Sequence, residues 1–181
     1  MVTPFYKDVF FWALVASLAI VLEFLVFLPN KRYPRWVYRI SGVIALSTFE
    51  VVRFFIPYFP QPKIFLPDWL RYLGLLLFFL GVIIMVGAFV QIMQAKRENW
   101  KLRTTGFYSL VRHPLYFGDV LWNFGWCVYK GSVYGIWLTL VWIFLRYTLS
   151  VLEEEKLLQK YGFEYQNYAK KVKHRVVPFI L

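Results

Sequence analysis

Long apolar runs constrain the fold of this chain more than any other feature of its sequence. The first three runs cover Val9–Leu28, Val37–Ile56 and Leu70–Met93. A helix of about 20 apolar residues, rising about 1.5 Å per residue, spans the hydrocarbon core of a bilayer, which is about 30 Å thick. The sequence therefore predicts three transmembrane helices within residues 1–94, and it favours a retained first helix over a cleaved signal peptide.

Two shorter segments follow in the second half of the chain. A fourth apolar run begins after Pro114 and ends near Tyr129, and a fifth covers Val133–Leu152. Gly131 allows a tight turn between them, which predicts a helical hairpin, although the fourth run is short for a complete crossing. The segment Glu153–Val172 has helical spacing of its apolar and aromatic residues. The chain is therefore predicted to be an all-α membrane bundle of about five transmembrane helices with cytoplasmic C-terminal helices.

Basic residues gather between the apolar runs. The 181 residues are 60% hydrophobic and 17% charged, with a net charge of +11. Soluble domains are roughly 45–50% apolar and about 25% charged. Basic loops alternate with less basic ones along the five predicted spans, so the positive-inside rule predicts an N-terminus outside and a C-terminus in the cytoplasm. The membrane is then a prokaryotic plasma membrane or the endoplasmic reticulum, and the loop charges require no nucleic-acid partner.

The sequence carries few residues for disulfides or metal sites. Cys127 is the single cysteine, and His113 and His174 are the two histidines. One cysteine excludes an internal disulfide, and two histidines are too few for a His-rich metal site without help from carboxylates. We predict no metal site. The chain has no internal repeat or flexible linker, so we predict a single domain over residues 1–181, and its oligomeric state is left open.

Polar side chains inside a membrane are costly and therefore mark candidate functional sites. The candidates are Glu23, Glu50, Arg53, Asp119, Asn123 and Arg146. Glu50 and Arg53 are three residues apart and can form a structural ion pair on one helix. Asp119 and Asn123 are four residues apart and can either join helices or contact a ligand. Arg146 lies about two turns before the acidic cluster Glu153-Glu154-Glu155. A carboxylate of this cluster can hold an ammonium group or ribose hydroxyls.

Polar and aromatic residues are densest in residues 99–116. Pro114 suits the first turn of a helix, where its missing N–H has no intrahelical partner to lose. His113 then lies at a helix N-terminus, whose free N–H groups can bind an anionic group. Tyr108 and Tyr116 offer flat surfaces for an adenine ring or a sulfonium cation. These residues predict a pocket that combines anion binding with aromatic stacking.

Several motifs occur in order over residues 99–178. They are Thr104-Thr105-Gly106-Phe107-Tyr108, Arg112-His113-Pro114-Leu115-Tyr116, Glu153-Glu154 with Leu157, Tyr161-Gly162, Tyr165, Tyr168, Val172 and Pro178. Together they resemble the isoprenylcysteine carboxyl methyltransferase family, part of a wider group of membrane methyltransferases that includes phospholipid N-methyltransferases. The resemblance implies S-adenosylmethionine as cofactor. It also implies a cytoplasmic pocket within residues 95–181, closed by the C-terminal helices and open sideways to lipid for a lipophilic acceptor.

The resemblance also implies roles for individual residues. The implied cofactor contacts are Trp100, Lys101, Leu102, Arg103, Tyr108, His113, Pro114, Leu115, Tyr116 and Glu153. The first four rest on position alone, since the family has a histidine in place of Trp100 and an apolar residue in place of Arg103. Arg146 is expected to orient an acidic acceptor. His113 or Glu154 is expected to remove a proton from an amine or thiol acceptor, whereas a carboxylate acceptor needs no base.

One departure from the family pattern concerns the acceptor. The family has an arginine four residues before the Glu-Glu pair, placed to meet the substrate carboxylate, and this chain has Leu149 there. Arg146 lies one turn earlier on nearly the same face and can substitute. Carboxyl methylation of an isoprenylcysteine-type substrate is the reaction that we expect. Methylation of a phospholipid, or of a small lipophilic amine or thiol, is the alternative.

Two other classes of protein fit parts of the sequence. NADPH-dependent sterol-type membrane reductases have a similar Arg-His-Pro-x-Tyr motif and a tail that resembles Lys160-Tyr161-Gly162, although they are usually larger. A small transporter or a structural membrane subunit would explain Glu50 and Arg53 as a polar path through the bundle. Most small transporters contain an inverted repeat, and this sequence has none.

Overall fold

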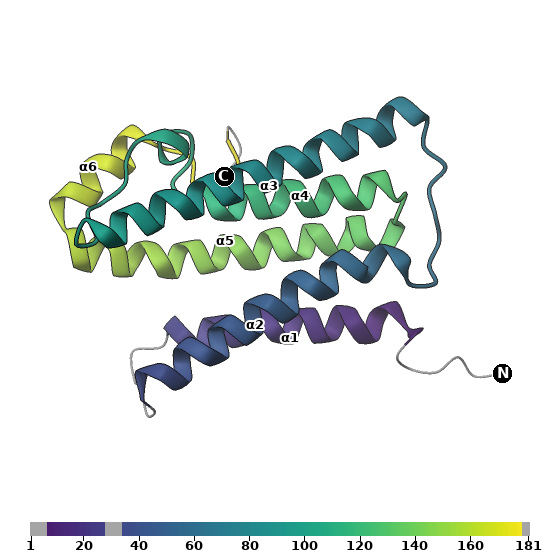
Figure 1. The fold of residues 1–181 in the computed structure, drawn as a ribbon, viewed down its shortest axis with the longest axis horizontal. Coiled ribbons are helices and arrows are strands. Elements are labelled where there is room, and N and C mark those ends of the chain that lie inside the picture. Colours follow the sequence, from purple (N-terminus) through teal and green to yellow (C-terminus); the bar gives the residue numbers. More distant parts are fainter. Residues whose placement is uncertain (1–6, 28–33, 179–181) are drawn as a thin grey trace.

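The structure is a computed structural model that describes residues 7–27 and 34–178, and the side chains of residues 23–27 and of Arg35 lie outside the description. It consists of helices joined by short segments, so the predicted all-α fold is confirmed (Figure 1). The elements are α1 (Val9–Phe27), α2 (Arg35–Phe55), η2 (Ile56–Tyr58), α3 (Asp68–Arg97), η3 (Gly106–Ser109), α4 (Pro114–Tyr129), α5 (Val133–Tyr161) and α6 (Phe163–Lys171). The candidate Glu23 therefore has no described side chain.

Local sequence explains where the helices begin. Pro34 and Pro67 immediately precede α2 and α3, and Pro114 is the first residue of α4. Proline suits these positions because a helix N-terminus leaves its first N–H groups without intrahelical partners. Ser132 caps α5, since its side-chain oxygen accepts a hydrogen bond from the backbone N–H of Gly135 at 3.1 Å.

Three of the described helices are long and apolar enough to cross a bilayer. They include residues Trp36–Tyr58, Asp68–Arg97 and Val133–Tyr161. Their outward faces carry large apolar side chains, such as Phe79 on α3 and Phe144 on α5. Their length and apolar surface indicate an integral membrane protein. Five crossings and the orientation of the termini stay predictions, because α4 has 16 residues and the described apolar part of α1 is short.

Helices α3, α4 and α5 run side by side, and α1 and α2 form a second pair that lies beside α5 (Figure 1). Glycines bring α3 and α4 into close contact. A Cβ atom built on Gly81 would lie 2.3 Å from the backbone nitrogen of Trp122, and one on Gly118 would lie 2.7 Å from the backbone nitrogen of Met85. Small residues at such positions let membrane helices pack backbone to backbone.

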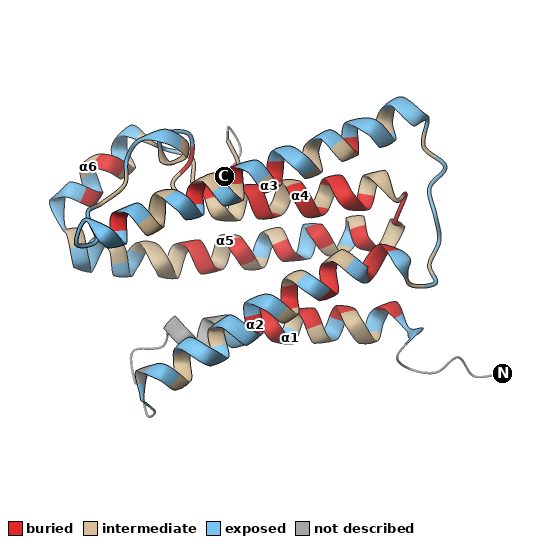
Figure 2. Ribbon diagram, viewed as in Figure 1, coloured by how far each residue is buried: buried red, intermediate tan, exposed pale blue. Residues whose placement is uncertain are grey.

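Buried residues concentrate along α4 and where α1 and α2 meet α5 (Figure 2). One apolar cluster joins α1, α2 and α5 through Ile20, Phe49 and Trp142. Leu149 belongs to this cluster and is fully buried. The position at which the related family has a substrate-binding arginine is therefore part of the apolar core here.

Helix α5 is longer than the predicted fifth run, which ended at Leu152. It continues to Tyr161 because the residues that follow are mostly Glu, Lys, Leu and Gln, which favour helix. It ends at Gly162, whose φ of 52° is accessible to glycine and rare for other residues. The acidic cluster consequently lies on the same rigid helix as Arg146 rather than on a separate one.

Candidate active site

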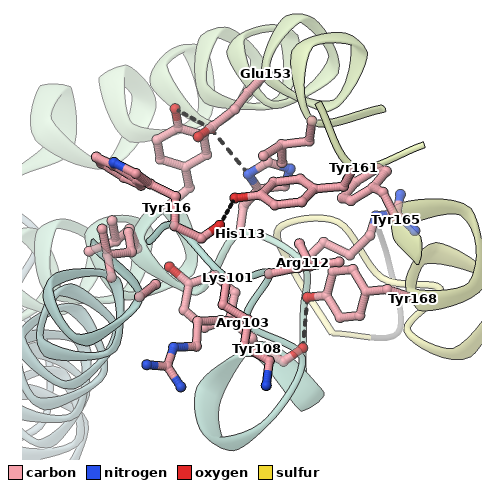
Figure 3. A pocket seen from close by; sticks show the side chains of 16 residues that line it. Lys101, Arg103, Tyr108, Arg112, His113, Tyr116, Glu153, Tyr161, Tyr165 and Tyr168 are labelled. Atoms are coloured by element: carbon pink, nitrogen blue, oxygen red, sulfur yellow. Dashed lines mark hydrogen bonds and ion pairs between the residues drawn. The ribbon is translucent and has the colours of Figure 1, made fainter. Parts of the chain in front are cut away.

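A first cavity of about 220 Å³ lies among the end of α3, the segment that follows it, the start of α4, the last third of α5 and α6 (Figure 3). Most of the predicted cofactor contacts line it. These are Trp100, Lys101, Leu102, Arg103, Tyr108, His113, Leu115, Tyr116 and Glu153. Pro114 does not line the cavity and is buried in the first turn of α4. The fold thus brings together residues that are up to 53 positions apart, from Trp100 to Glu153.

Other residues that the sequence did not suggest as cofactor contacts also line this cavity, and all but Ile92 and Ala95 belong to the motifs that carry the family resemblance. They are Ile92, Ala95, Arg112, Leu157, Tyr161, Tyr165 and Tyr168. Tyr161 ends α5, whereas Tyr165 and Tyr168 lie on α6, beyond the break at Gly162. The helical spacing of these tyrosines was visible in the sequence. The direction in which α6 turns back over the cavity was not, because it depends on the dihedral angles of one glycine.

Glu153 presents a carboxylate to the first cavity. Its Oε2 atom accepts a hydrogen bond from the hydroxyl of Tyr116 at 3.1 Å and lies 3.3 Å from Nδ1 of His113 (Figure 3). The side chain is 37% exposed, so part of the carboxylate remains accessible to a ligand. Tyr116 and His113 fix the position of the Glu153 carboxylate, which remains partly exposed to the cavity.

Glu154 does not line the cavity and is held in an ion cluster. Its carboxylate lies 2.7 Å from Nε of Arg112, 3.1 Å from Nε of Arg175 and 3.3 Å from Nε2 of His113. Arg112 also donates to the backbone oxygen of Val172 at 2.9 Å. The cluster therefore attaches the segment after α6 to the start of α4 and to α5.

His113 connects the two carboxylates. Its side chain is buried, with one ring nitrogen toward Glu153 and the other toward Glu154. Burial alone would lower the pKa of His113, but the hydrogen bonds and charges of both carboxylates outweigh burial and raise this pKa above its ordinary value. The imidazole is therefore stabilised in its protonated form, in which it has no free lone pair to accept a further proton.

The cavity wall formed by residues 100–103 begins at an unusual backbone turn. Asn99 and Trp100 have φ values of 55° and 60°, which few residues other than glycine adopt. Two hydrogen bonds hold this turn: the Trp100 N–H donates to the Ala95 carbonyl at 2.7 Å, and the Tyr161 hydroxyl donates to the Trp100 carbonyl (Figure 3). Left-handed conformations of this kind often occur at ligand sites.

A second cavity of about 570 Å³ lies between α2 and α3 and reaches α4 and α5. Its lining is mostly apolar, and the exposed side chains of Leu46, Val86 and Phe89 form part of it. It shares three lining residues with the first cavity, which are Ile92, Leu115 and Tyr116. A common wall therefore separates a polar, aromatic cavity from an apolar one.

Arg146 lines the second cavity and not the first. Its Nε lies 2.8 Å from Asp119 Oδ2, and its Nη2 lies 3.3 Å from Glu50 Oε1. Arg53 contacts the same carboxylates, at 2.7 Å from Asp119 and 3.6 Å from Glu50. The predicted Glu50–Arg53 pair is thus part of a larger charge cluster, whose described members also include Asp119 and Arg146. Asn123 lies elsewhere, and its side-chain oxygen accepts from Thr139 at 2.7 Å.

Among residues 7–27 and 34–178, no group of three or more His, Cys, Asp and Glu side chains is arranged to hold a metal ion. The site consists instead of one accessible carboxylate, several tyrosines and adjoining apolar space. Within a membrane bundle, these features define a class of integral membrane protein that can bind a polar ligand and a lipophilic ligand at one wall.

The family of this chain is shown by its similarity to known proteins. Residues 69–164 match the phospholipid methyltransferase family, and the chain belongs to that family. The match extends from α3 to the start of α6, so it includes most of the first cavity. The residues Glu50 and Arg53 on α2 lie outside it.

Individual relatives fall into two groups. Protein-S-isoprenylcysteine O-methyltransferase B of Arabidopsis thaliana is 31% identical over 122 residues, which are 62% of this chain and 61% of the relative. A probable protein-S-isoprenylcysteine O-methyltransferase of Oryza sativa subsp. indica is 35% identical over 133 residues, or 67% of each chain. The Delta(14)-sterol reductase TM7SF2 of Mus musculus is 30% identical over 86 residues, which are 44% of this chain and 20% of the reductase. The chain spans about a fifth of the length of the sterol reductases that it matches. No solved structure matches it.

Proposed function

We propose that this protein is a methyltransferase that binds S-adenosylmethionine in the first cavity and a membrane-embedded lipophilic acceptor in the second. The observation that carries this proposal is the common wall of Ile92, Leu115 and Tyr116 between the two cavities. A polar methyl donor and a lipid-soluble acceptor need adjacent sites with opposite character. Membership of the phospholipid methyltransferase family supports the reaction type.

The residues of the first cavity fit the chemistry of the donor. The hydroxyl of Tyr165 and the Nε atom of Arg103 are buried without a hydrogen-bond partner, and both residues line this cavity. Buried polar atoms normally have partners, so these two are available to a ligand. The Glu153 carboxylate suits the donor's ammonium group or ribose hydroxyls. Pockets for whole ligands are usually about 300–1,000 Å³. A donor larger than this 220 Å³ cavity would extend past its rim at the exposed residues Trp100 and Lys101.

When bound, S-adenosylmethionine supplies an electrophilic methyl group, and the protein supplies binding and orientation. Glu153 anchors one end of the donor, and the ring of Tyr116 belongs to both cavities, so it contacts either ligand. Holding two reactants in line can contribute roughly 7–11 kcal/mol to lowering a barrier. Alignment across the common wall is therefore the main contribution that we assign to this chain.

The geometry favours positioning roles for His113 and Glu154, which the sequence suggested as proton acceptors. His113 is stabilised as the imidazolium, and Glu154 is surrounded by three cationic or protonated groups. Both residues hold Glu153 and the segment after α6 in place. The ring nitrogens of His113 and the carboxylate of Glu154 are engaged by groups of the protein itself, which favours positioning over proton transfer.

Carboxyl methylation of an isoprenylcysteine-type acceptor remains the reaction that the names of two relatives suggest. Such an acceptor needs a cation near its carboxylate. Leu149 belongs to the apolar core, and Arg146 is paired with Asp119 and Glu50. A lipophilic amine or thiol is therefore an equally valid acceptor for testing.

Donor binding tests the proposal directly. The purified protein in detergent is titrated with S-adenosylmethionine by calorimetry, together with the variant Glu153→Gln. Loss of a charged hydrogen bond of about 1.5–3 kcal/mol should weaken binding by roughly 10- to 150-fold. The variant Glu155→Gln changes an exposed carboxylate on the same helix and should bind the donor normally. Unchanged affinity in Glu153→Gln, or no binding by the unmodified protein, would refute the proposed donor site.

A membrane reductase is the second candidate, because three Delta(14)-sterol reductases match part of this chain. The same titration with NADPH distinguishes the two candidates. Binding of NADPH in preference to S-adenosylmethionine would favour the reductase.

A further inference from the structure

Glu50 is the accessible member of the charge cluster at the second cavity. Its side chain is 27% exposed, whereas the side chains of Arg53 and Arg146 are 2% and 3% exposed and that of Asp119 is 5% exposed. Glu50, Asp119 and Arg146 are the charged residues that line this cavity. A ligand that enters the cavity therefore meets a carboxylate before it meets a cation.

The two arginines are committed to partners within the cluster. Arg53 donates to Oδ1 and to the backbone oxygen of Asp119, at 2.7 and 3.2 Å, and Arg146 donates to Oδ2 at 2.8 Å. Both guanidinium groups also contact the ring of Phe49, with centroid distances of 4.3 and 4.8 Å. Turning either arginine toward a ligand would leave Asp119 buried with an incomplete set of partners, which is strongly unfavourable.

The cluster lies close to the wall that the two cavities share. The guanidinium carbon of Arg146 lies 5.2 Å from the ring centroid of Tyr116, and Arg146 also contacts Glu50. Tyr116 in turn donates its hydroxyl hydrogen bond to Glu153 in the first cavity. A head group bound at Glu50 would therefore lie at the polar end of the second cavity, on the side of the first.

We propose that Glu50 binds the cationic head group of an amphiphilic amine whose alkyl chain occupies the apolar part of the second cavity. Among the described side chains of the cluster, each arginine already faces two carboxylates. A ligand carboxylate would approach Glu50 without an accessible cation to offset the repulsion. An ammonium group would gain a charged partner, and the apolar lining of Leu46, Val86 and Phe89 suits a hydrocarbon chain.

This inference rests on the proposed function in treating the second cavity as the acceptor site, and it names that acceptor as an amine. Before methyl transfer the bound ammonium must pass one proton to the Glu50 carboxylate or to water. The neutral nitrogen then forms its bond to the methyl carbon as the carbon–sulfur bond of the donor breaks and the sulfur leaves as a neutral thioether. Glu50 lies on α2, outside residues 69–164 that match the family. Its role is therefore assigned by the geometry of this chain alone. It also revises the sequence-based expectation that Arg146 orients an acidic acceptor, since Arg146 here serves to position Glu50.

The test compares three single-chain ligands that differ only in their head groups: dodecylamine, dodecanoate and dodecanol. Binding of each radiolabelled ligand to the protein is measured in uncharged micelles at about pH 8, where an alkyl amine keeps its proton, and binding to protein-free micelles is subtracted. We expect the amine to bind about tenfold more tightly than dodecanol, which is the size of one charged hydrogen bond. Dodecanoate should bind most weakly.

Two variants locate the effect. Glu50→Gln should remove the preference for the amine while dodecanol binding stays unchanged. Leu46→Trp narrows the apolar part of the second cavity and should weaken the binding of all three ligands. Binding of S-adenosylmethionine to the first cavity reports that each variant is folded. A preference for dodecanoate, or an amine preference that survives Glu50→Gln, would overturn the proposal. Glu50-dependent amine binding in a protein that does not bind S-adenosylmethionine would support the head-group site and refute the methyl-donor proposal.

Discussion

At the scale of single residues, Asp119 joins three helices through one carboxylate. Its side chain accepts hydrogen bonds from Arg53 on α2, from Arg146 on α5 and from the indole of Trp122 on its own helix. Buried charges are tolerated when they are paired and fully hydrogen-bonded. One buried carboxylate thus joins the pair of α1 and α2 to the other three long helices.

Replacing Asp119 with Asn should destabilise the protein strongly. The substitution removes the charge that compensates two buried arginines, and breaking a buried pair in this way typically costs about 3–5 kcal/mol. Thermal or denaturant unfolding in detergent measures the change. Asp68→Asn is a suitable control, because Asp68 forms an exposed pair with Arg71 at 3.4 Å that should contribute less than about 1 kcal/mol. Similar losses in the two variants would contradict the role given to Asp119.

The residues of this cluster show what sequence can predict at this scale. Helical spacing alone was enough to pair Glu50 with Arg53, which lie 3.6 Å apart. Spacing could not show that Asp119 and Arg146, which are 27 residues apart, share that pair, because this depends on how α4 and α5 approach α2. For the same reason the sequence suggested that Arg146 orients an acidic acceptor without indicating its pairs with Asp119 and Glu50.

At the scale of helices, the contact between α3 and α4 depends on glycines that face each other. A Cβ atom on Gly118 would lie 2.7 Å from the backbone oxygen of Gly81 and from the backbone nitrogen of Met85. Backbone atoms cannot move aside as a flexible side chain can. Any side chain at Gly118 must therefore push the two helices apart, and the start of α4 carries His113 and Tyr116 of the site.

The variant Gly118→Val should lower stability by about 1–3 kcal/mol, the usual cost of overpacking a tight contact. It should also weaken ligand binding in the first cavity, because the cavity lies between the ends of the two helices. Unfolding in detergent and donor titration measure the two effects. Leu76→Ala on the exposed face of α3 is the control, and it should change neither quantity by more than about 0.5 kcal/mol. Normal stability of Gly118→Val would argue against close packing at this contact.

The helices themselves were largely predictable because apolar run length and proline positions report on them directly. The ends of the helices were harder to predict from the sequence. The continuation of α5 through Glu153 to Tyr161 depends on helix formers that also suit a new helix, so the sequence left the boundary ambiguous. The short helix η3 over Gly106–Ser109 was missed, because four residues carry no periodic pattern.

At the scale of the whole molecule, the segment after α6 closes one end of the bundle. The backbone N–H groups of Arg112 and His113 donate to the carbonyls of His174 and Arg175 at 2.9 and 2.8 Å, and Arg175 also pairs with Glu154. These contacts join the start of α4, the last third of α5 and the C-terminal segment. The integrity of the first cavity therefore depends on a few charged residues.

This arrangement predicts that the stability of the closed end of the bundle depends on pH. The folded protein raises the pKa of His113, so the proton on this residue stabilises the fold. The contribution is complete below the ordinary histidine pKa of about 6.5, and it is lost as the pH rises through the higher pKa of the folded state. Hydrogen exchange of the backbone amides at positions 112 and 113 between about pH 6 and pH 9 measures it, after correction for the intrinsic rate, because these N–H groups donate to the C-terminal segment. Protection should fall with rising pH in the unmodified protein and less steeply in His113→Gln. Equal slopes would contradict the assignment.

The common wall of Ile92, Leu115 and Tyr116 affects how the concentrations of the two ligands must be expressed. In the proposed function, one cavity is filled from water and the other from the bilayer. The relevant abundance of the donor is then its molarity, whereas that of the acceptor is its mole fraction among lipids. Adding inert lipid at constant bulk concentration would dilute the acceptor and leave the donor unaffected. Saturation of such an enzyme with the acceptor depends on the lipid composition of its membrane, whereas saturation with the donor depends on the donor concentration in water.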